Sequence, residues 1–412
     1  MNWSMEGLLI MGSFAVWSFR LGTCLSVTFM LLALPFMREA QAHAYSASYS
    51  TLELTKSATY LTFAIDELSA IELAGGDEDG NGMYDQAEFD AVKDRLVSVF
   101  DDHLTVTIGG ETKSWTQLDS LVLERRGDES KVVMIAQYPP IADMMPFSFK
   151  DSLYKDDKKT NYVNLLTSLY GPQKSTAALS AGDRTWTIAL SGDEYAALSE
   201  WPQKDHAADS SEQGSGEPAV QPNTGKTDVT SGWVSFLKLG MNHILGGYDH
   251  LLFLFSLLIA RQTFKQYAGM ITAFTVAHSV TLSLTVLGII DVSPAIVEPL
   301  IALSICFVAV DNIIRPNVSH RWVLTFLFGL IHGMGFADIL KEMDIPKSQL
   351  ATDLISFNAG IEIVQLAIVA VLVPLLYRLH RYKFSRQAVV AGSGLALAMG
   401  AIWLVERVSS FL

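Results

Sequence analysis

Four histidines and an aspartate stand in apolar stretches of the carboxy-terminal half of this chain. The stretch "NHILGGYDHLL" contains His243, Asp249 and His250, and two later apolar stretches contain His278 and His332. A charged or strongly polar group near the bilayer centre costs about 2.5–3.5 kcal/mol on insertion scales, so such residues in a membrane segment usually mark a function. The residue types point to metal chemistry, because imidazole and carboxylate groups bind metal ions.

The depth of these histidines in their apolar stretches is a second indication. His250, His278 and His332 each lie about 10 residues from the cytoplasmic end of their stretch, which at about 1.5 Å per residue is close to the bilayer midplane. A single histidine in a membrane helix is as often a structural hydrogen-bond donor, but three at one depth favour a shared site. Further polar residues lie nearer the outer face: His243, Glu298, Asn358 and Glu362.

The spacing within the first stretch predicts which side chains share a helix face. Seven residues, almost two helical turns, separate His243 from His250. A continuous helix would therefore carry both on one face, with Gly246 and Gly247 between them. Small residues there would let another helix or an ion approach the backbone closely.

The predicted ligand is a transition-metal dication. Neutral imidazole suits nickel, cobalt, zinc and copper, whereas a magnesium or calcium site would be mostly oxygen. Carboxylates at Asp249, Glu298 and Glu362 would offset its charge in the low dielectric. Affinity order alone does not separate nickel from zinc, so the sequence predicts nickel, cobalt or zinc.

The composition is that of a membrane protein with a polar, acidic part. Of the 412 residues, 50% are hydrophobic and 17% are charged, which is too apolar for one soluble globule. The net charge of −14 disfavours nucleic acid as a partner and would gather cations near the acidic part. Cys24 and Cys306 are the only cysteines, which excludes a disulfide framework and a thiolate metal cluster.

Six apolar stretches follow Trp233, each near the 20 residues that a helix needs to cross the lipid bilayer. They cover residues 235–260, 267–290, 293–314, 322–340, 354–378 and 388–406. Lysine and arginine concentrate in alternate loops, so the first helix should run from outside to inside. The predicted fold of residues 231–412 is an α-helical polytopic membrane domain with six transmembrane helices. Glycines in the first and fourth stretches favour an inverted repeat of two three-helix halves.

The amino-terminal part is predicted to be exported. Residues 1–42 contain the apolar core "LGTCLSVTFMLLALPF" before small residues, which predicts a signal peptide, cleaved after Ala42 or Ala44, or an uncleaved anchor. Residues 43–201 contain the alternating stretches "YSTLELT", "ATYLTFAID", "HLTVTIGGETKSW", "KVVMIAQYP" and "RTWTIALS", which predict a β-rich domain with one or two helices. Residues 202–230, rich in glycine, proline, serine and charge, are typical of a flexible linker.

An acidic loop in this domain, "DEDGNGMYDQAE" at residues 77–88, matches the EF-hand pattern. Tyr84 replaces the usual aliphatic residue at position eight, and no second hand is recognisable. We expect calcium to stabilise the domain here; the alternative is an acidic surface turn. The predicted calcium ligands are Asp77, Asp79, Asn81, the Met83 carbonyl, Asp85 and the bidentate Glu88.

The membrane motifs resemble those of one family. His243, followed after five residues by Asp249-His250, resembles the signature of the HupE/UreJ nickel permeases associated with hydrogenase and urease maturation. The stretches "FTVAHSVTLSL", "VEPLIALSICFVAVDN", "FGLIHGMGFAD" and "FNAGIEIVQL" resemble the second branch of that family, over residues 235–380. The resemblance implies that His243, Asp249, His250 and His332 take part in nickel or cobalt passage.

Two positions depart from the pattern of the founding branch. Phe328 and Gly335 stand where that branch has a histidine and a glutamate. His278, Glu298 and Glu362 could supply the missing groups.

The sequence therefore predicts a permease for nickel or cobalt in the bacterial inner membrane, with residues 43–230 on the exported side. The alternative is an intramembrane zinc hydrolase, in which His250, His278 and His332 hold zinc and Asp249 or Glu362 is the general base. A third hypothesis is a calcium-responsive membrane sensor. The sequence names no protein partner for the exported domain.

Overall fold

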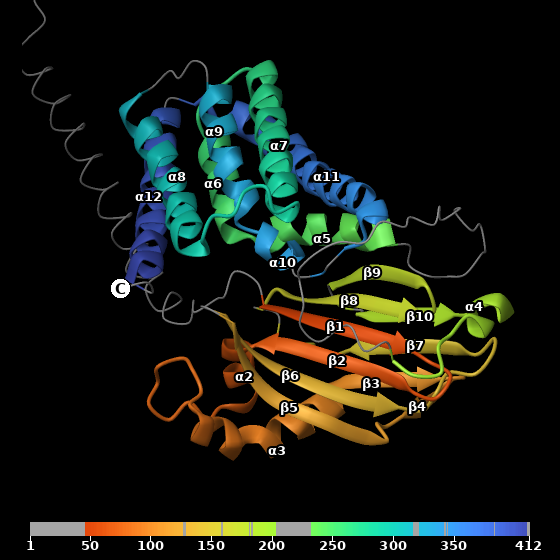
Figure 1. Ribbon diagram of the computed structural model, residues 1–412. Helices are drawn as coiled ribbons and strands as arrows, with labels where there is room; N and C mark the ends of the chain where they lie inside the picture. Colours follow the sequence, from red (N-terminus) through yellow and green to blue (C-terminus); the bar gives the residue numbers. More distant parts are fainter. Residues whose placement is uncertain are drawn as a thin grey trace, which may run out of the picture.

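The computed structural model consists of a helical bundle and a β domain that lie against each other (Figure 1). The described residues are 46–126, 129–157, 160–180, 182, 184–202, 232–315, 321–341, 343, 345–382 and 384–409. The predicted signal peptide or anchor, residues 1–42, lies outside them, and so does the predicted linker, residues 202–230, apart from its first residue.

The bundle is formed by helices of very different lengths. They are α5 (Gly232–Gly246), α6 (Tyr248–Leu258), α7 (Phe264–Val286), α8 (Pro294–Ile314), α9 (Arg321–Met334), α10 (Ala337–Lys341), α11 (Lys347–Leu379) and α12 (Ser385–Ser409). Of these, α7, α8, α11 and α12 are long and apolar enough to cross a membrane. α6 and α9, with 11 and 14 residues, reach only about 16 and 21 Å, less than the ~30 Å of hydrocarbon. Four of the six predicted spans are thus continuous helices, and the first and fourth are broken.

The first predicted span breaks at Gly246-Gly247. α5 runs beneath the other helices, along the β domain, and α6 turns upward into the bundle (Figure 1). A β-carbon on Gly246 would lie 2.3 Å from Asn161 Nδ2, and one on Gly247 would lie 2.8 Å from the His243 carbonyl oxygen, so the break requires glycine. The prediction that His243 and His250 share one face of a continuous helix is therefore wrong, because they stand on different helices.

The fourth predicted span breaks between α9 and α10. The packing then repeats between the two halves of the bundle: α9 packs against α7, α5 packs against α11, and α8 packs against α12. A broken segment of each half thus pairs with a long helix of the other half. The inverted repeat itself stays a prediction.

The β domain consists of two sheets. The larger has the strand order β5-β6-β2-β1-β8-β9, and the smaller has the order β10-β7-β3-β4. The larger sheet is mixed, because β1 pairs with β2 antiparallel and with β8 in parallel. The strands are β1 (Ser46–Leu54), β2 (Thr59–Asp66), β3 (Leu104–Ile108), β4 (Glu111–Lys113), β5 (Gln117–Arg126), β6 (Glu129–Tyr138), β7 (Pro146–Asp151), β8 (Tyr162–Tyr170), β9 (Gln173–Ser180) and β10 (Thr185–Ala189).

The predicted β-rich character of this part is confirmed. The predicted hairpin joins β3 to β4 through Gly109 and Gly110, whose φ angles of 61° and 86° suit a type I′ turn. Phe63 of the larger sheet, Phe149 of the smaller sheet and Phe100 of a helix meet in one fully buried core. The helices of this part are α2 (Glu67–Ala74), α3 (Gln86–His103) and α4 (Gly192–Ala196).

One face of the larger sheet is buried against the bundle, which the sequence does not predict. Val163 on β8 is fully buried in a cluster that also contains Phe357 of α11. The backbone N–H of Ala178 donates to Ser235 Oγ on α5 at 3.1 Å. Asn161 Nδ2 donates to the carbonyl oxygen that ends α5 at 2.7 Å. The β domain therefore supports the helix break from outside.

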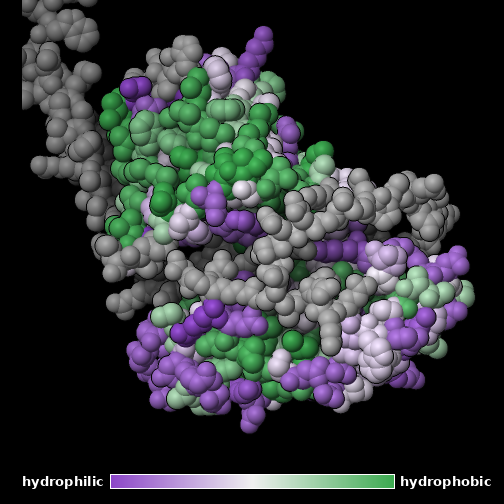
Figure 2. Space-filling view, in the orientation of Figure 1, coloured by the Kyte–Doolittle hydropathy of each residue, from purple (hydrophilic) through white to green (hydrophobic). Residues whose placement is uncertain are grey.

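The surfaces of the two parts differ as their surroundings require. Figure 2 shows apolar side chains over the outside of the bundle and mostly hydrophilic ones over the β domain. Ile314, Val371 and Val405 on three helices of the bundle are 70%, 72% and 67% exposed. A contiguous exposed apolar surface of this kind fits contact with lipid.

Val163→Asp is expected to loosen the contact between sheet and bundle, because it places an unpaired carboxylate in an apolar seam. A short bifunctional cross-linker between cysteines at Ser180 and Asn242, whose side chains lie 3.0 Å apart, should then join the two parts much less efficiently. Val122→Asp is the matched control, because Val122 is 40% exposed on β5 of the same sheet. Equal cross-linking in both variants would contradict the claim that Val163 holds the sheet against the bundle.

Candidate metal site

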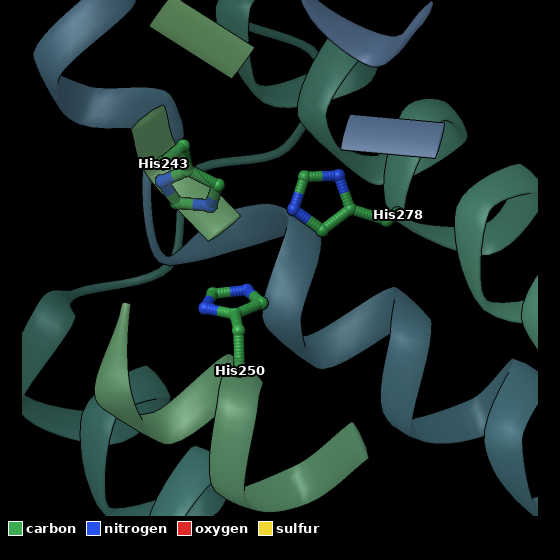
Figure 3. Close-up of side chains that lie close together, drawn as sticks. All are labelled: His243, His250 and His278. Atoms are coloured by element: carbon green, nitrogen blue, oxygen red, sulfur yellow. The ribbon is translucent and has the colours of Figure 1, made fainter. Parts of the chain in front are cut away.

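Three imidazole rings from three helices converge in the interior of the helical part. Figure 3 shows His243 of α5, His250 of α6 and His278 of α7 around one common space. One ligand nitrogen from each ring lies within 4.8 Å of those of the other two. All three residues are buried, with at most 7% of their surface exposed. The sequence predicts a shared site of His250, His278 and His332, and in the structure His243, which the sequence places nearer the outer face, is the third member of the closest group.

The spacing of the rings suits a metal ion after a small adjustment. The ring centroids of His243 and His250 are 4.7 Å apart, and that of His278 is 5.9 Å and 6.1 Å from them. Bonds of about 2.0–2.1 Å to a tetrahedral ion need ligand nitrogens roughly 3.3 Å apart. Ring movements on the order of 1 Å would bring the nitrogens to that spacing.

His332 of α9 adds a fourth ring beside the first three. Its centroid is 5.1 Å from that of His250, and the residue is fully buried. His332 Nδ1 lies 2.9 Å from the carbonyl oxygen of Phe328. His332 Nε2 makes no hydrogen bond to the described part of the chain.

Asp249 orients the central ring of the cluster. Its Oδ1 accepts the backbone N–H of His250 at 2.8 Å and lies 3.0 Å from His250 Nδ1. A carboxylate in this position fixes the proton on Nδ1, as in the carboxylate–histidine pairs of metal sites. The other nitrogen, Nε2, is buried without a hydrogen bond to the described residues and is available to a metal.

Two close backbone approaches hold the rings in place. A β-carbon on Gly247 would lie 2.9 Å from His250 Nδ1, so α6 can begin beside the site only with glycine there. A β-carbon on Gly333 would lie 2.4 Å from the carbonyl oxygen of His278, where α9 crosses α7. Glycine at position 333 thus lets α9 cross α7 closely, with His332 and His278 at the crossing.

Aromatic side chains close the site on two sides. Phe336 and Phe357 stack at 5.2 Å, and their centroids lie 4.4 Å and 5.5 Å from that of His243. Phe253 and Phe274 lie 4.7 Å and 5.3 Å from His332. These walls exclude water from the rings, and a low dielectric strengthens the interaction of an ion with its ligands.

The remaining predicted residues lie around the cluster. Asn358 of α11 lies beside His278 of α7. Glu298 at the start of α8 and Glu362 on α11 are partly buried, and neither belongs to the group of mutually close ligand atoms among the described residues. Gln365, one turn further on α11, bonds Thr275 of α7 at 3.0 Å. Glu298 and Glu362, predicted nearer the outer face, thus stand outside the group of close histidines.

Arg407 of α12 is a residue of the site that the sequence does not reveal. Its Nη2 lies 3.4 Å from Asp249 Oδ2, and its Nε lies 3.8 Å from Glu298 Oε2. Its Nη1 donates to the backbone carbonyl of Glu298 at 3.2 Å. In the sequence Arg407 is one of a few cations at the outer ends of the apolar stretches. An arginine at a helix end is commonly an interfacial anchor, so position alone does not show that it points inward.

The predicted calcium loop lies far from this cluster, between α2 and α3. Ligand oxygens of Asp77, Asp79 and Glu88 lie within 4.8 Å of one another. The backbone N–H of Gly82 donates to Asp77 and, with those of Gly80 and Asn81, holds the pKa of Asp77 below its ordinary value. A carboxylate that stays ionised in this way favours a cation.

The other predicted calcium ligands are engaged in hydrogen bonds within the loop or are exposed. Asn81 Oδ1 accepts the backbone N–H of Met83 at 2.7 Å, and Met83 is 50% exposed. Asp85 caps α3 by accepting the backbone N–H of Glu88 at 2.8 Å, and Glu88 Oε2 accepts the N–H of Asp85 at 2.8 Å. A bound cation would therefore have to draw Glu88 away from these hydrogen bonds.

Tyr84 anchors this loop to the β domain. The side chain is fully buried. Its backbone N–H donates to Glu67 Oε1 at 2.6 Å, and its carbonyl oxygen accepts a hydrogen bond from Arg125 of β5. Buried backbone groups need partners, and here two side chains of the β domain supply them.

The comparisons with known proteins agree with the motifs of the membrane part. The family described as HupE / UreJ protein matches residues 221–407. No curated protein matches the chain. The matched range contains α5 to α11 and α12 as far as Arg407, and with them the four histidines and Asp249. Residues 221–407 thus match the HupE/UreJ family, in agreement with the resemblance of the motifs, and the described part of this range contains four helices long and apolar enough to cross a membrane.

Proposed function

We propose that this protein carries a transition-metal dication, nickel or cobalt in the first place, across the inner membrane through the histidine cluster. The observation that supports this most directly is the convergence of three buried imidazoles from α5, α6 and α7 within 4.8 Å. The cluster lies in the range that matches the HupE/UreJ family. Neutral imidazole in an apolar enclosure selects borderline metals over calcium or magnesium.

The roles of the residues follow from their positions. His243, His250 and His278 hold the ion, with His332 as a fourth ligand that can take over from His243. Asp249 orients His250 and balances part of the charge. Glu298, Glu362 and Asn358 line the way to the cluster at its edge. Passage of the ion from one ligand to the next needs no covalent chemistry.

The driving force can come from the membrane potential alone. Moving one elementary charge through 100 mV is worth about 2.3 kcal/mol, so a dication gains about 4.6 kcal/mol. With the β domain on the exported side, an inside-negative potential draws the ion from the outer end of the bundle to the cytoplasm. The broken segments α5/α6 and α9/α10 meet at the site, as in transporters whose halves move against each other.

Uptake of radioactive nickel into proteoliposomes tests this function. Purified full-length protein should take up the ion when an inside-negative potassium diffusion potential is imposed, and cobalt should compete. A chain that is inserted and folded but shows no more uptake than empty vesicles would exclude transport. Hydrolysis of a substrate at a bound zinc would then become the leading explanation of the same cluster.

We also propose that the loop at residues 77–88 binds calcium and stabilises the β domain. At a calcium concentration about 100-fold above the dissociation constant, binding adds about 2.7 kcal/mol, which raises Tm by roughly 5 °C or more. Glu88→Gln should abolish this shift, because it removes the bidentate ligand. Glu78→Gln is the matched control, since Glu78 occupies a loop position without a predicted ligand. Thermal unfolding with calcium and with a chelator measures both, and an equal calcium shift in the two variants would disprove calcium binding at this loop.

A further inference from the structure

We propose that Arg407 is a tethered cation that competes with the transported dication for the carboxylate of Asp249 and so weakens the hold of the histidine cluster on its metal. The inference rests on the proposed transport function and concerns the same site. α12 contributes no histidine to the cluster. Through Arg407, however, this helix controls how readily the ion leaves.

The geometry places one carboxylate between the imidazole of His250 and the guanidinium of Arg407. Asp249 Oδ1 is engaged by His250, whose ring is part of the cluster, and Asp249 Oδ2 lies 3.4 Å from Arg407 Nη2. The side chains of Asp249 and Arg407 are only 11% and 18% exposed, so water screens this pair poorly. Any charge that arrives at His250 is therefore felt by the same carboxylate that holds the guanidinium.

The count of charges sets the sign of the effect. Asp249 and Glu298 carry two negative charges, which together would balance a dication. Arg407 contacts both residues and takes up one of these charges. A bound dication would add two positive charges beside a carboxylate that already faces the guanidinium, and like charges at this range repel. Arg407 must therefore either move away from Asp249 or lower the affinity of the cluster for the metal.

A transporter needs such an opposing charge. Four buried imidazoles and an unopposed carboxylate would form a site that keeps its ion. Conduction requires binding that is favourable enough to load the site and weak enough to release it. Arg407 meets this requirement because it can return to Asp249 when the ion leaves, which restores the charge balance of the buried carboxylate.

The first test separates affinity from turnover. In proteoliposomes, Arg407→Gln should lower the nickel concentration for half-maximal uptake about tenfold and also lower the maximal rate, because the ion leaves more slowly. Arg407→Lys keeps the charge and should stay closer to the wild type than Arg407→Gln. Arg378→Gln is the control, since Arg378 is exposed at the opposite end of α11. A raised half-maximal concentration in Arg407→Gln would overturn the proposal.

The second test does not depend on how well Arg407→Gln folds. Asp249→Asn removes the carboxylate nearest to the cluster and leaves the guanidinium of Arg407 in place, so equilibrium binding of nickel to the detergent-solubilised full chain should be weakest there. The double variant Asp249→Asn and Arg407→Gln also removes this cation and should bind nickel about tenfold more tightly than Asp249→Asn alone. If the double variant binds no better, Arg407 merely positions Asp249 and the competition does not exist.

These outcomes are distinct from a failure of the transport function. That function fails if the wild type takes up no nickel or if the loss of His250 leaves uptake unchanged. The competition fails, with transport intact, if uptake depends on His250 but removal of Arg407 does not tighten nickel binding in either background.

Discussion

His250→Ala is expected to reduce nickel affinity by more than about 100-fold and to abolish uptake. His250 is the centre of the cluster, with ring centroids of three other histidines 4.7, 6.1 and 5.1 Å away. It is also the ring that Asp249 orients. Loss of a residue that only orients a metal ligand already costs about 10- to 100-fold in affinity, and the ligand itself should cost more.

His380→Ala is the matched control for this prediction. His380 ends α11 at the other end of the bundle, where its Nε2 lies 3.1 Å from the carbonyl oxygen of Ile259. Its loss should leave nickel binding unchanged. Equilibrium dialysis with both purified variants measures the difference. If His250→Ala binds nickel like His380→Ala, the histidine cluster is not the metal site.

Gly333→Ala is expected to damage the site without changing any ligand. The new β-carbon would lie 2.4 Å from the carbonyl oxygen of His278, which belongs to the backbone and cannot rotate away. α9 must then move away from α7, which separates His332 from the other rings. Overpacking of this kind costs about 1–3 kcal/mol, so we expect Tm to fall by roughly 3–10 °C and nickel affinity to fall at least about tenfold.

Gly394→Ala tests whether any added methyl group has this effect. A β-carbon on Gly394 of α12 meets no atom within 4 Å. Replacement of glycine by alanine in a helix is by itself favourable by up to about 1 kcal/mol. Gly394→Ala should therefore keep or raise Tm and keep nickel binding. A Gly333→Ala variant that matches it in both respects would show that the α7–α9 crossing does not set the geometry of the site.

The sequence predicts the members of the cluster better than the path of the chain. Polar residues in lipid are rare, and this signal selects all four histidines but places His243 nearer the outer face, apart from His250, His278 and His332, whereas the structure puts it within 4.8 Å of His250 and His278. The break at Gly246-Gly247 is not predictable from periodicity, because hydrophobicity continues through it and glycine pairs also occur in continuous, closely packed membrane helices. The position of the break depends on the side chain of Asn161, which contacts the backbone of Gly246. Asn161 lies in the β domain, far away in the sequence.

The strands also show what the sequence predicts and what it does not. β1, β2 and β3 alternate between buried and partly buried residues, and the alternation in the sequence predicts them. β8 has seven successive buried residues, because one of its faces meets the core and the other meets the bundle. A strand buried on both faces does not alternate. Its place could follow only from knowledge of the contact between sheet and bundle.

X-ray absorption spectroscopy of nickel bound to the purified full-length protein tests the histidine site most directly. We expect about one nickel per chain, with three or four imidazole nitrogens at about 2.0–2.1 Å, the distance of metal–histidine bonds, and multiple scattering from the rings. The same measurement on a variant without His243, His250 and His278 should show no such shell. Oxygen-only coordination, or a spectrum that the triple variant leaves unchanged, would show that this protein does not hold its metal between the helices.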